Sequence, residues 1–142
     1  MTFIGDENLP PALMEILARF DATNRYIAFL EAGFIAGVAD QEWMPKVLAM
    51  PDHPIISQDA QVVRNKAQHI VFKGARGSYI CLGEPFGRLN FQQKVLAMVR
   101  VWPTVLACVE DDITHDAAGV YLVKTRAPYI SKRHEMASFQ SP

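Results

Sequence analysis

The chain has 142 residues, half of them apolar, which is enough for one domain with a sizeable core. Its formal charge of −1 excludes a globally basic surface, although a local basic rim around an acidic site leaves the net charge near zero. The two cysteines, Cys81 and Cys108, lack metal-ligand spacing and indicate unpaired buried thiols in a reducing compartment.

The N-terminal residues do not have the pattern of a secretion signal, in which a basic region precedes an apolar stretch. The longest apolar stretch, residues 95–109, contains Arg100 and Pro103 and is too short to span a bilayer. We therefore expect a cytoplasmic protein that does not bind a membrane.

Strand-like and helix-like apolar spacing alternate along the chain. Strands are expected at 2–5, 24–31, 53–59, 78–83 and 118–125, the last of them at an edge of the sheet. Helices are expected at 10–20, 40–50, 60–73 and 89–111, the last with Asn90 as its N-cap. The alternation predicts an α/β three-layer sandwich with a mostly parallel central sheet. We expect one domain over residues 1–125 and a mobile tail over 126–142, which shows no periodicity.

Three aspartates stand where a parallel sheet gathers its functional groups. Asp6 ends the first predicted strand, Asp59 ends the third, and Asp40 opens the helix before that third strand. Functional groups of parallel sheets collect at the carboxyl ends of the strands. Converging carboxylates repel one another, and a bound divalent cation usually relieves that repulsion. Ligands that are all oxygen favour Mg²⁺ or Mn²⁺.

Helix capping is the alternative explanation for these acids. Asp6 with Asn8, then Asp40, then Asp59 all come just before or at the start of a predicted helix, where a carboxylate or amide caps the first turn. Glu42 lies two residues beyond Asp40 and points elsewhere on a regular helix. The sequence leaves both explanations open.

A cluster of this kind suits hydrolysis of a phosphodiester, because Mg²⁺ held by carboxylates activates water and stabilises the leaving oxygen. Basic side chains must then hold the nucleic-acid backbone. Four of them follow Asp59 at roughly helical spacing: Arg64, Lys66, Lys73 and Arg76.

The segments "DENLPPAL", "ADQEWM" and "IISQD" together resemble the PIN-domain nucleases, in particular the PIN-like branch typified by VapC-type toxins. The resemblance covers residues 3 to about 85. It implies that Asp6, Asp40 and Asp59 bind the metal, with Glu42 as a nearby catalytic substitute. It also implies that Ser57 is the hydroxyl that accompanies the site.

The resemblance further implies an Mg²⁺- or Mn²⁺-dependent ribonuclease, a toxin with an antitoxin protein as partner, and a homodimer. We expect the substrate RNA to contact Ser57, Asn8, Arg64, Lys73 and Arg76. A fourth acid, which many members carry, has no clear counterpart here, and Glu7, Glu42 and Glu84 are the candidates.

Two other functions fit the same pattern. A catalytically silent PIN-like interaction module needs no metal. A receiver-like phosphoacceptor domain also has an acidic pair after its first strand, but it needs a Thr or Ser and then a Lys on its last two strands. Only Lys124 is available for that second position.

Overall fold

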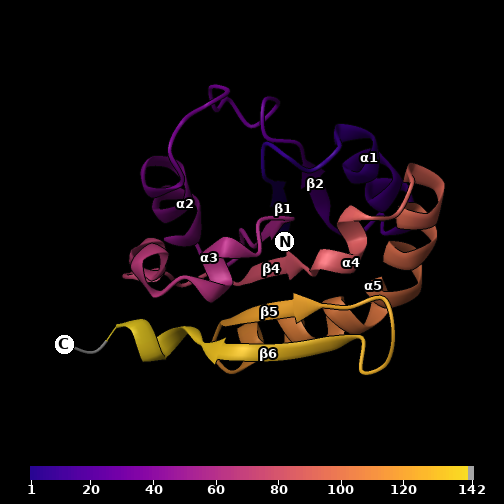
Figure 1. The fold of residues 1–142 in the computed structure, drawn as a ribbon. Coiled ribbons are helices and arrows are strands. Elements are labelled where there is room, and N and C mark those ends of the chain that lie inside the picture. The colour runs from indigo at the N-terminus through magenta and orange to yellow at the C-terminus, as the bar shows by residue number, and fades with distance from the viewer. Residues whose placement is uncertain (141–142) are drawn as a thin grey trace.

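A six-stranded sheet forms the centre of the computed structural model, which describes residues 1–140 (Figure 1). The strands are β1 (Thr2–Gly5), β2 (Arg25–Ile27), β3 (Ile55–Ser57), β4 (Tyr79–Leu82), β5 (Gly119–Val123) and β6 (Ile130–Glu135). They lie in the order β2-β1-β3-β4-β5-β6. The first five are parallel and β6 runs antiparallel beside β5, which confirms the predicted sheet.

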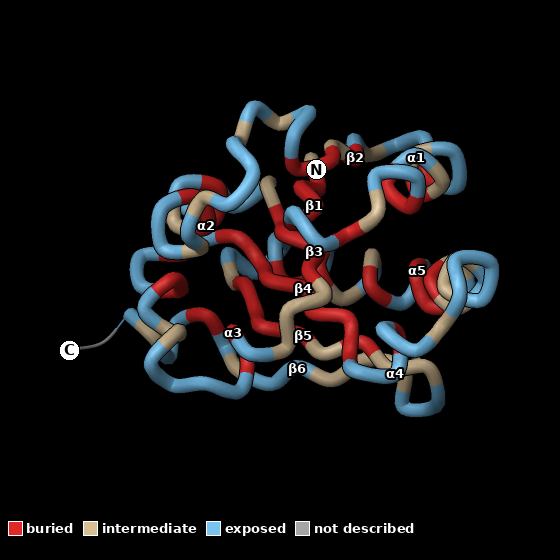
Figure 2. Tube along the Cα trace, turned by 45° about the horizontal axis from the view of Figure 1, so that its top comes forward, coloured by how far each residue is buried: buried red, intermediate tan, exposed pale blue. Residues whose placement is uncertain are grey.

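Helices cover both faces of this sheet (Figure 1). The α-helices are α1 (Pro11–Phe20), α2 (Asp40–Leu48), α3 (Gln61–Arg64), α4 (Glu84–Gly87) and α5 (Phe91–Thr114). Two 3₁₀ helices are η1 (Lys66–Phe72) and η2 (Met136–Phe139). Buried side chains form one cluster under α1 and α5 and a second under α2, α3 and η1, and Figure 2 shows these buried segments between the exposed outer turns. The predicted three-layer sandwich is therefore confirmed.

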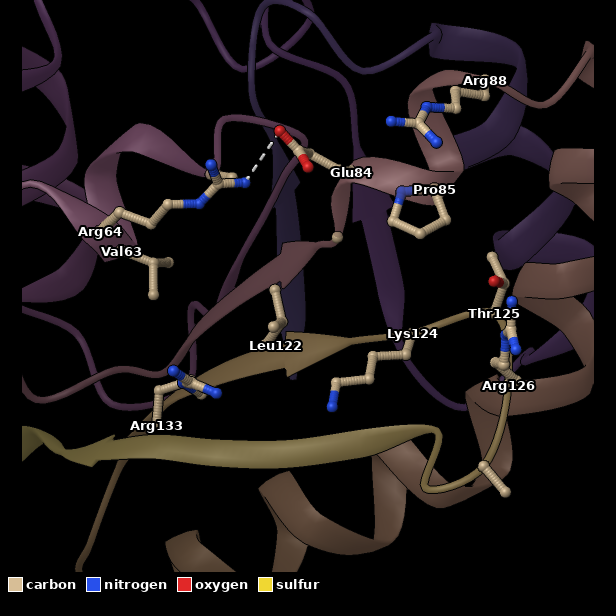
Figure 3. A pocket seen from close by; sticks show the side chains of 13 residues that line it. Val63, Arg64, Glu84, Pro85, Arg88, Leu122, Lys124, Thr125, Arg126 and Arg133 are labelled. Atoms are coloured by element: carbon tan, nitrogen blue, oxygen red, sulfur yellow. Dashed lines mark ion pairs between the residues drawn. The ribbon is translucent and has the colours of Figure 1, made fainter.

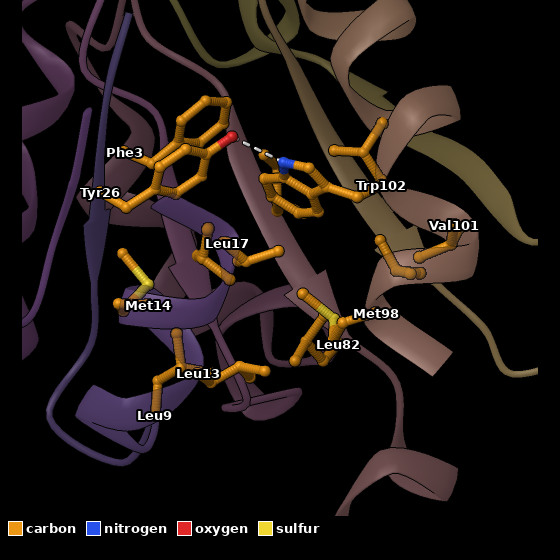
Figure 4. Close-up of a cluster of buried hydrophobic side chains, with 14 of the residues drawn as sticks. Phe3, Leu9, Leu13, Met14, Leu17, Tyr26, Leu82, Met98, Val101 and Trp102 are labelled. Carbon is orange, nitrogen blue, oxygen red and sulfur yellow. Dashed lines mark hydrogen bonds between the residues drawn. The ribbon is translucent and has the colours of Figure 1, made fainter. Parts of the chain in front are cut away.

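Three aromatic rings organise the core under α1 and α5 (Figure 4). Phe3 of β1 stacks on Tyr26 of β2 with ring centroids 4.9 Å apart, and Trp102 of α5 packs edge-on against Phe3 at 5.3 Å. Trp102 Nε1–H donates to the Tyr26 hydroxyl at 2.7 Å, so this core pairs the polar atoms it buries. Burial of each such ring contributes roughly 2 kcal/mol. These contacts fix α5 across β1 and β2.

The start of α5 is the capped helix end that the sequence predicts. Asn90 Oδ1 accepts the Gln93 N–H at 2.9 Å, and Gln93 Oε1 accepts the Asn90 N–H at 3.0 Å. This reciprocal pair is a capping box, which satisfies two backbone donors that a helix end otherwise leaves free.

The helix predicted over 60–73 is broken into two shorter pieces. α3 ends at Arg64 and η1 begins at Lys66, with Asn65 between them at φ −90° and ψ 110°. Asn65 Oδ1 accepts the Ala67 N–H at 3.0 Å, so this side chain starts a new helix instead of continuing the old one. The helical spacing expected from Arg64 onward is therefore not kept.

Residues 130–135, predicted to lie in an irregular tail, form β6. The pairing runs from Ile130 beside Val123 to Glu135 beside Gly119, so β5 is an interior strand and its predicted edge position is wrong. Charged residues such as Lys132 and Arg133 are typical of edge strands and hide the strand from an apolar pattern. Residues 141–142 of the predicted tail lie outside the described residues.

None of the helices within residues 1–140 is long and apolar enough to cross a lipid bilayer. Both cysteines are free thiols, with Cys81 buried in β4 and Cys108 half-buried on α5.

Candidate active site at the carboxyl edge of the sheet

The predicted acids lie at the carboxyl edge, the edge at which the parallel strands β1 to β5 end. The chain leaves β1 to form β2 on one side and later returns to form β3 on the other. β1 and β3 therefore flank a switch point in the strand order, the usual position of ligand sites in open α/β sheets. Asp6 follows β1 directly, and Asp59 follows β3 by two residues.

Asp6 is a buried carboxylate with one oxygen satisfied and one left over. The residue is 5% exposed. Ser57 Oγ–H donates to Asp6 Oδ2, and the Gln58 N–H reaches the same oxygen at 3.3 Å. Asp6 Oδ1 has no hydrogen-bond partner among the described residues. Burial raises the pKa of Asp6 more than these hydrogen bonds lower it.

Gly5 allows this arrangement, because it ends β1 against the turn that carries Asp6. A Cβ on Gly5 would lie 3.2 Å from Leu9 Cδ2 and from the side chain of Met14, tighter than ordinary packing. Glycine therefore lets α1 lie close to the end of β1.

Asp40, the first residue of α2, is half-buried and lies near two other acids. Burial raises its pKa, and the negative charges of Asp59 and Glu7 raise it further, while a hydrogen bond from Trp43 Nε1–H at 3.2 Å lowers it. The Glu7 carboxylate is held in place by the Gly37 N–H at 2.9 Å. Glu7 is thus the fourth-acid candidate that lies within electrostatic range of Asp40.

Asp59 is tied to the same edge through Ser57. The Asp59 N–H donates to Ser57 Oγ at 2.9 Å, and Ser57 in turn donates to Asp6. One serine hydroxyl therefore links the two strand-end aspartates. Asp59 Oδ1 also accepts the Gln61 N–H at 3.0 Å at the start of α3.

The capping alternative holds only in part. Pro10 is the N-cap of α1 and Ala39 that of α2, and neither helix start receives a side-chain cap from Asp6 or Asp40. Asp59 contributes to the start of α3 through Gln61. The N-cap of α3 is Ala60, so Asp59 supports the first turn of that helix without capping it, and Asp6 and Asp40 cap neither α1 nor α2.

The carboxylates of Asp6, Asp40 and Asp59 are the kind of oxygen ligand that Mg²⁺ and Mn²⁺ prefer. Asp6 Oδ1 is also buried without a hydrogen-bond partner, so it is available to a cation. Within residues 1–140, however, no three His, Cys, Asp or Glu side chains lie close enough together to hold a metal ion. The carboxylates are neighbours at one edge, and they are not gathered into a finished coordination shell.

A sequence model of the PIN-like domain family matches residues 1–84, more than half of the chain. The chain belongs to the PIN-like domain family. The match contains all three predicted metal ligands and ends at the first residue of α4. No curated protein and no solved structure matches the chain. The family indicates a nuclease-type fold.

Glu42 and Asn8 are less closely connected to this PIN-like site. Glu42 is exposed on α2 and has no side-chain hydrogen bond in the part of the chain described. Asn8 is exposed, and its carbonyl oxygen accepts Gln58 Nε2–H at 3.3 Å. Glu84 instead pairs with Arg64 at 3.2 Å.

The predicted substrate-binding cations are not on one side of the PIN-like domain. Arg64 ends α3 and lies at the carboxyl edge near Asp59. Lys73 follows Phe72, which packs on Tyr79 at the start of β4 with ring centroids 5.3 Å apart. The Arg76 N–H donates to the Leu48 carbonyl at the end of α2. Lys73 and Arg76 therefore lie toward the opposite edge of the sheet, away from the acids.

Gln58 and Lys94 are site residues that the sequence does not reveal. The Gln58 side chain receives a hydrogen bond from Lys94 Nζ at 3.0 Å, while its backbone N–H reaches Asp6. Lys94 comes from the first turns of α5, far along the chain. Only the packing of α5 across the sheet brings this cation to the acids, so no local motif signals it.

Proposed function

We propose that the protein is a metal-dependent ribonuclease that hydrolyses RNA phosphodiester bonds. The observation that carries the proposal is the buried, unpartnered Oδ1 of Asp6 at the switch point of a PIN-like domain, with Asp40 and Asp59 at the same edge. A carboxylate oxygen that burial leaves without a donor is costly unless a ligand binds there.

Asp6, Asp40 and Asp59 would hold Mg²⁺ or Mn²⁺. When bound, such a cation activates water and stabilises the charge that develops on the phosphate. Ser57 orients Asp6 through its hydroxyl, and Glu7 adds negative charge beside Asp40. Lys94, held by Gln58, supplies a positive charge that attracts the phosphate backbone to this edge.

The test is cleavage of a single-stranded RNA with Mn²⁺ by the wild type and by Asp59→Asn. The control is Asp52→Asn, which changes an exposed acid before the other end of β3. We expect cleavage by the wild type and the control, and at least about a hundredfold loss in Asp59→Asn. Equal cleavage by all three would refute this site.

A silent interaction module is the second candidate, and the absence of a preassembled three-ligand group in residues 1–140 favours it. A wild-type protein that neither binds Mn²⁺ nor cleaves RNA would support the module. Membership in the PIN-like family favours both candidates over the receiver-like alternative.

We propose further that the enzyme is a toxin held by an antitoxin protein and acts as a homodimer in the cytoplasm. The support is the resemblance of "DENLPPAL", "ADQEWM" and "IISQD" to the VapC-type branch. Growth arrest on expression of the wild type, relieved by Asp59→Asn, is the expected result. Light scattering tests the dimer.

A further inference from the structure

A pocket of about 680 Å³ lies at the carboxyl ends of β4 and β5 (Figure 3). Its walls come from α3, from α4 and from the β5–β6 hairpin. Most of these residues follow position 84, so the pocket lies largely outside the stretch that matches the PIN-like family.

Positive charge dominates this basic pocket. It is lined by one acid, Glu84, and by five cations: Arg64, Arg88, Lys124, Arg126 and Arg133. Arg64 pairs with Glu84, whereas the other four form no ion pair with any described residue. Lys132, on the neighbouring position of β6, has two carboxylate partners, Asp112 and Glu135. Unpaired cations that line one pocket repel one another unless an anion binds between them.

The rest of the lining is aliphatic. Val63, Pro85 and Leu122 form part of it, and no aromatic ring lines it among the described residues. Proteins that grip bases in single strands usually stack them on aromatic rings. This pocket therefore suits phosphates and sugars more than bases.

The pocket adjoins the candidate active site along the chain. Ala60, one of its lining residues, directly follows Asp59, and Arg64 ends α3, the short helix that begins at Gln61. A nucleic-acid chain with one phosphate at Asp59 therefore reaches Arg64 next. It then reaches the cations of the β5–β6 hairpin.

We propose that the basic pocket binds consecutive phosphates of a single-stranded nucleic acid that continues from the acids. Its volume is that of an ordinary small-ligand site, enough for a short piece of single strand and too small for a duplex. That the strand is RNA rests on the proposed function, whereas the binding of phosphates rests on the pocket alone.

Binding without metal tests this directly, since it does not depend on cleavage. The probe is a fluorescein-labelled ten-nucleotide oligouridylate in EDTA, followed by fluorescence anisotropy over a range of salt concentrations. The test variant is Lys124→Ala/Arg126→Ala/Arg133→Ala. The control, Arg19→Ala/Arg25→Ala/Lys46→Ala, removes the same charge from exposed positions away from the pocket.

We expect the test variant to bind at least about tenfold more weakly, and the slope of log affinity against log salt to fall by about 2, because each phosphate contact in a single strand contributes about 0.7. The control should stay within about twofold of the wild type. A test variant that binds as the wild type does, or a control that loses as much, overturns the proposal. So does a wild type that does not bind the probe.

Competition with unlabelled strands then identifies the occupant. Single-stranded DNA of equal length should compete nearly as well as RNA, since phosphates dominate, and duplex RNA should compete poorly. A duplex that competes better than the single strand contradicts the proposal. If binding depends on the pocket but no RNA is cleaved, this inference stands and the proposed function is refuted. If RNA is cleaved but binding does not depend on the pocket, the proposed function stands and this inference is refuted.

Discussion

Asp6 and Asp21 are both buried aspartates beside the same sheet, and they differ in how completely their oxygens are satisfied. Asp21 is 8% exposed and follows α1. Its Oδ1 accepts the N–H and the hydroxyl of Thr23 at 3.1 and 2.6 Å, and its Oδ2 accepts Asn24 Nδ2–H at 2.7 Å and the Tyr26 hydroxyl at 2.6 Å. Asp6 has donors on one oxygen only.

The pKa values of the two aspartates move in opposite directions. Burial raises the pKa of both carboxyls. At Asp21 the hydrogen bonds from Thr23, Tyr26 and Asn24 outweigh burial and lower the pKa to about 2. At Asp6 burial prevails and the pKa is raised. A satisfied carboxylate stabilises the fold, and an unsatisfied one costs stability unless a ligand binds it.

The largest expected effect concerns the metal. Asp6→Asn should weaken Mn²⁺ binding at least about a hundredfold, because a neutral amide replaces a charged oxygen ligand. Asp21→Asn should leave the affinity within about twofold, since Asp21 takes no part in the acid site. Calorimetry measures both. Equal losses in the two variants would show that the affinity follows the stability of the fold.

The same titration separates the other ligands. Asp40→Asn and Asp59→Asn should each lose most of the Mn²⁺ binding. Normal binding in the Asp40 variant would move that ligand to Glu42 or Glu7.

The free energy of unfolding should depend on Asp21 rather than on Asp6, the reverse of the expected Mn²⁺ affinity. Asp21→Asn should lower the free energy of unfolding by about 2 kcal/mol at pH 7, because charged hydrogen bonds are lost and an amide N–H₂ then faces donors. Asp6→Asn should not lower it, since the variant removes a buried charge that lacks a full set of partners. Urea unfolding measures both free energies, and a large loss in Asp6→Asn contradicts the comparison.

The pH dependence of these differences follows from the two shifts. Asp21 has a lowered pKa, so its stabilising effect is complete above about pH 3.8 and is lost as the pH falls toward about 2. Asp6 has a raised pKa, so its cost is absent below about pH 3.8, grows as the pH rises above that value, and is complete above the raised pKa.

Each variant should therefore approach the wild type on acidification, in a different window. The difference in unfolding free energy between Asp6→Asn and the wild type should disappear at a higher pH than the difference between Asp21→Asn and the wild type. Unfolding curves between pH 2 and 7 test the order, and coincident windows would contradict it.

The sequence predicts Asp6 more readily than Asp21, and the reason is local. Asp6 directly follows an apolar strand, and that position alone places it at the carboxyl edge. Asp21 has two sequence neighbours as donors, Thr23 and Asn24, but Tyr26 reaches it in a core completed by Trp102 of α5. Such a network depends on tertiary packing, which a single stretch of sequence does not contain.

The fold class likewise follows from the alternation of strand-like and helix-like apolar spacing. The prediction is wrong for two elements, the irregular tail that forms β6 and the single helix over 60–73, and each has an identifiable cause. β6 is polar because it is an edge strand, so its apolar pattern is weak. The helical spacing expected from Arg64 to Arg76 is not kept, because Asn65 ends one helix and caps another. The cations of the basic pocket come from separate segments of the chain, and no spacing rule joins them.

The smallest expected effect comes from removing one hydroxyl beside each aspartate. Ser57→Ala takes away the donor to Asp6 Oδ2 and should weaken Mn²⁺ binding about tenfold, the usual cost of losing a partner that orients a ligand. Thr23→Val removes the hydroxyl that donates to Asp21 at 2.6 Å and should cost about 1 kcal/mol of stability with unchanged Mn²⁺ affinity. Because each substitution deletes one hydroxyl that donates to a buried carboxylate, the pair separates orientation of a metal ligand from stabilisation of the fold. Calorimetry and urea unfolding of both variants provide the two readouts. If Ser57→Ala changes only stability, Ser57 supports the fold as Thr23 does, and the distinction between the two aspartates is lost.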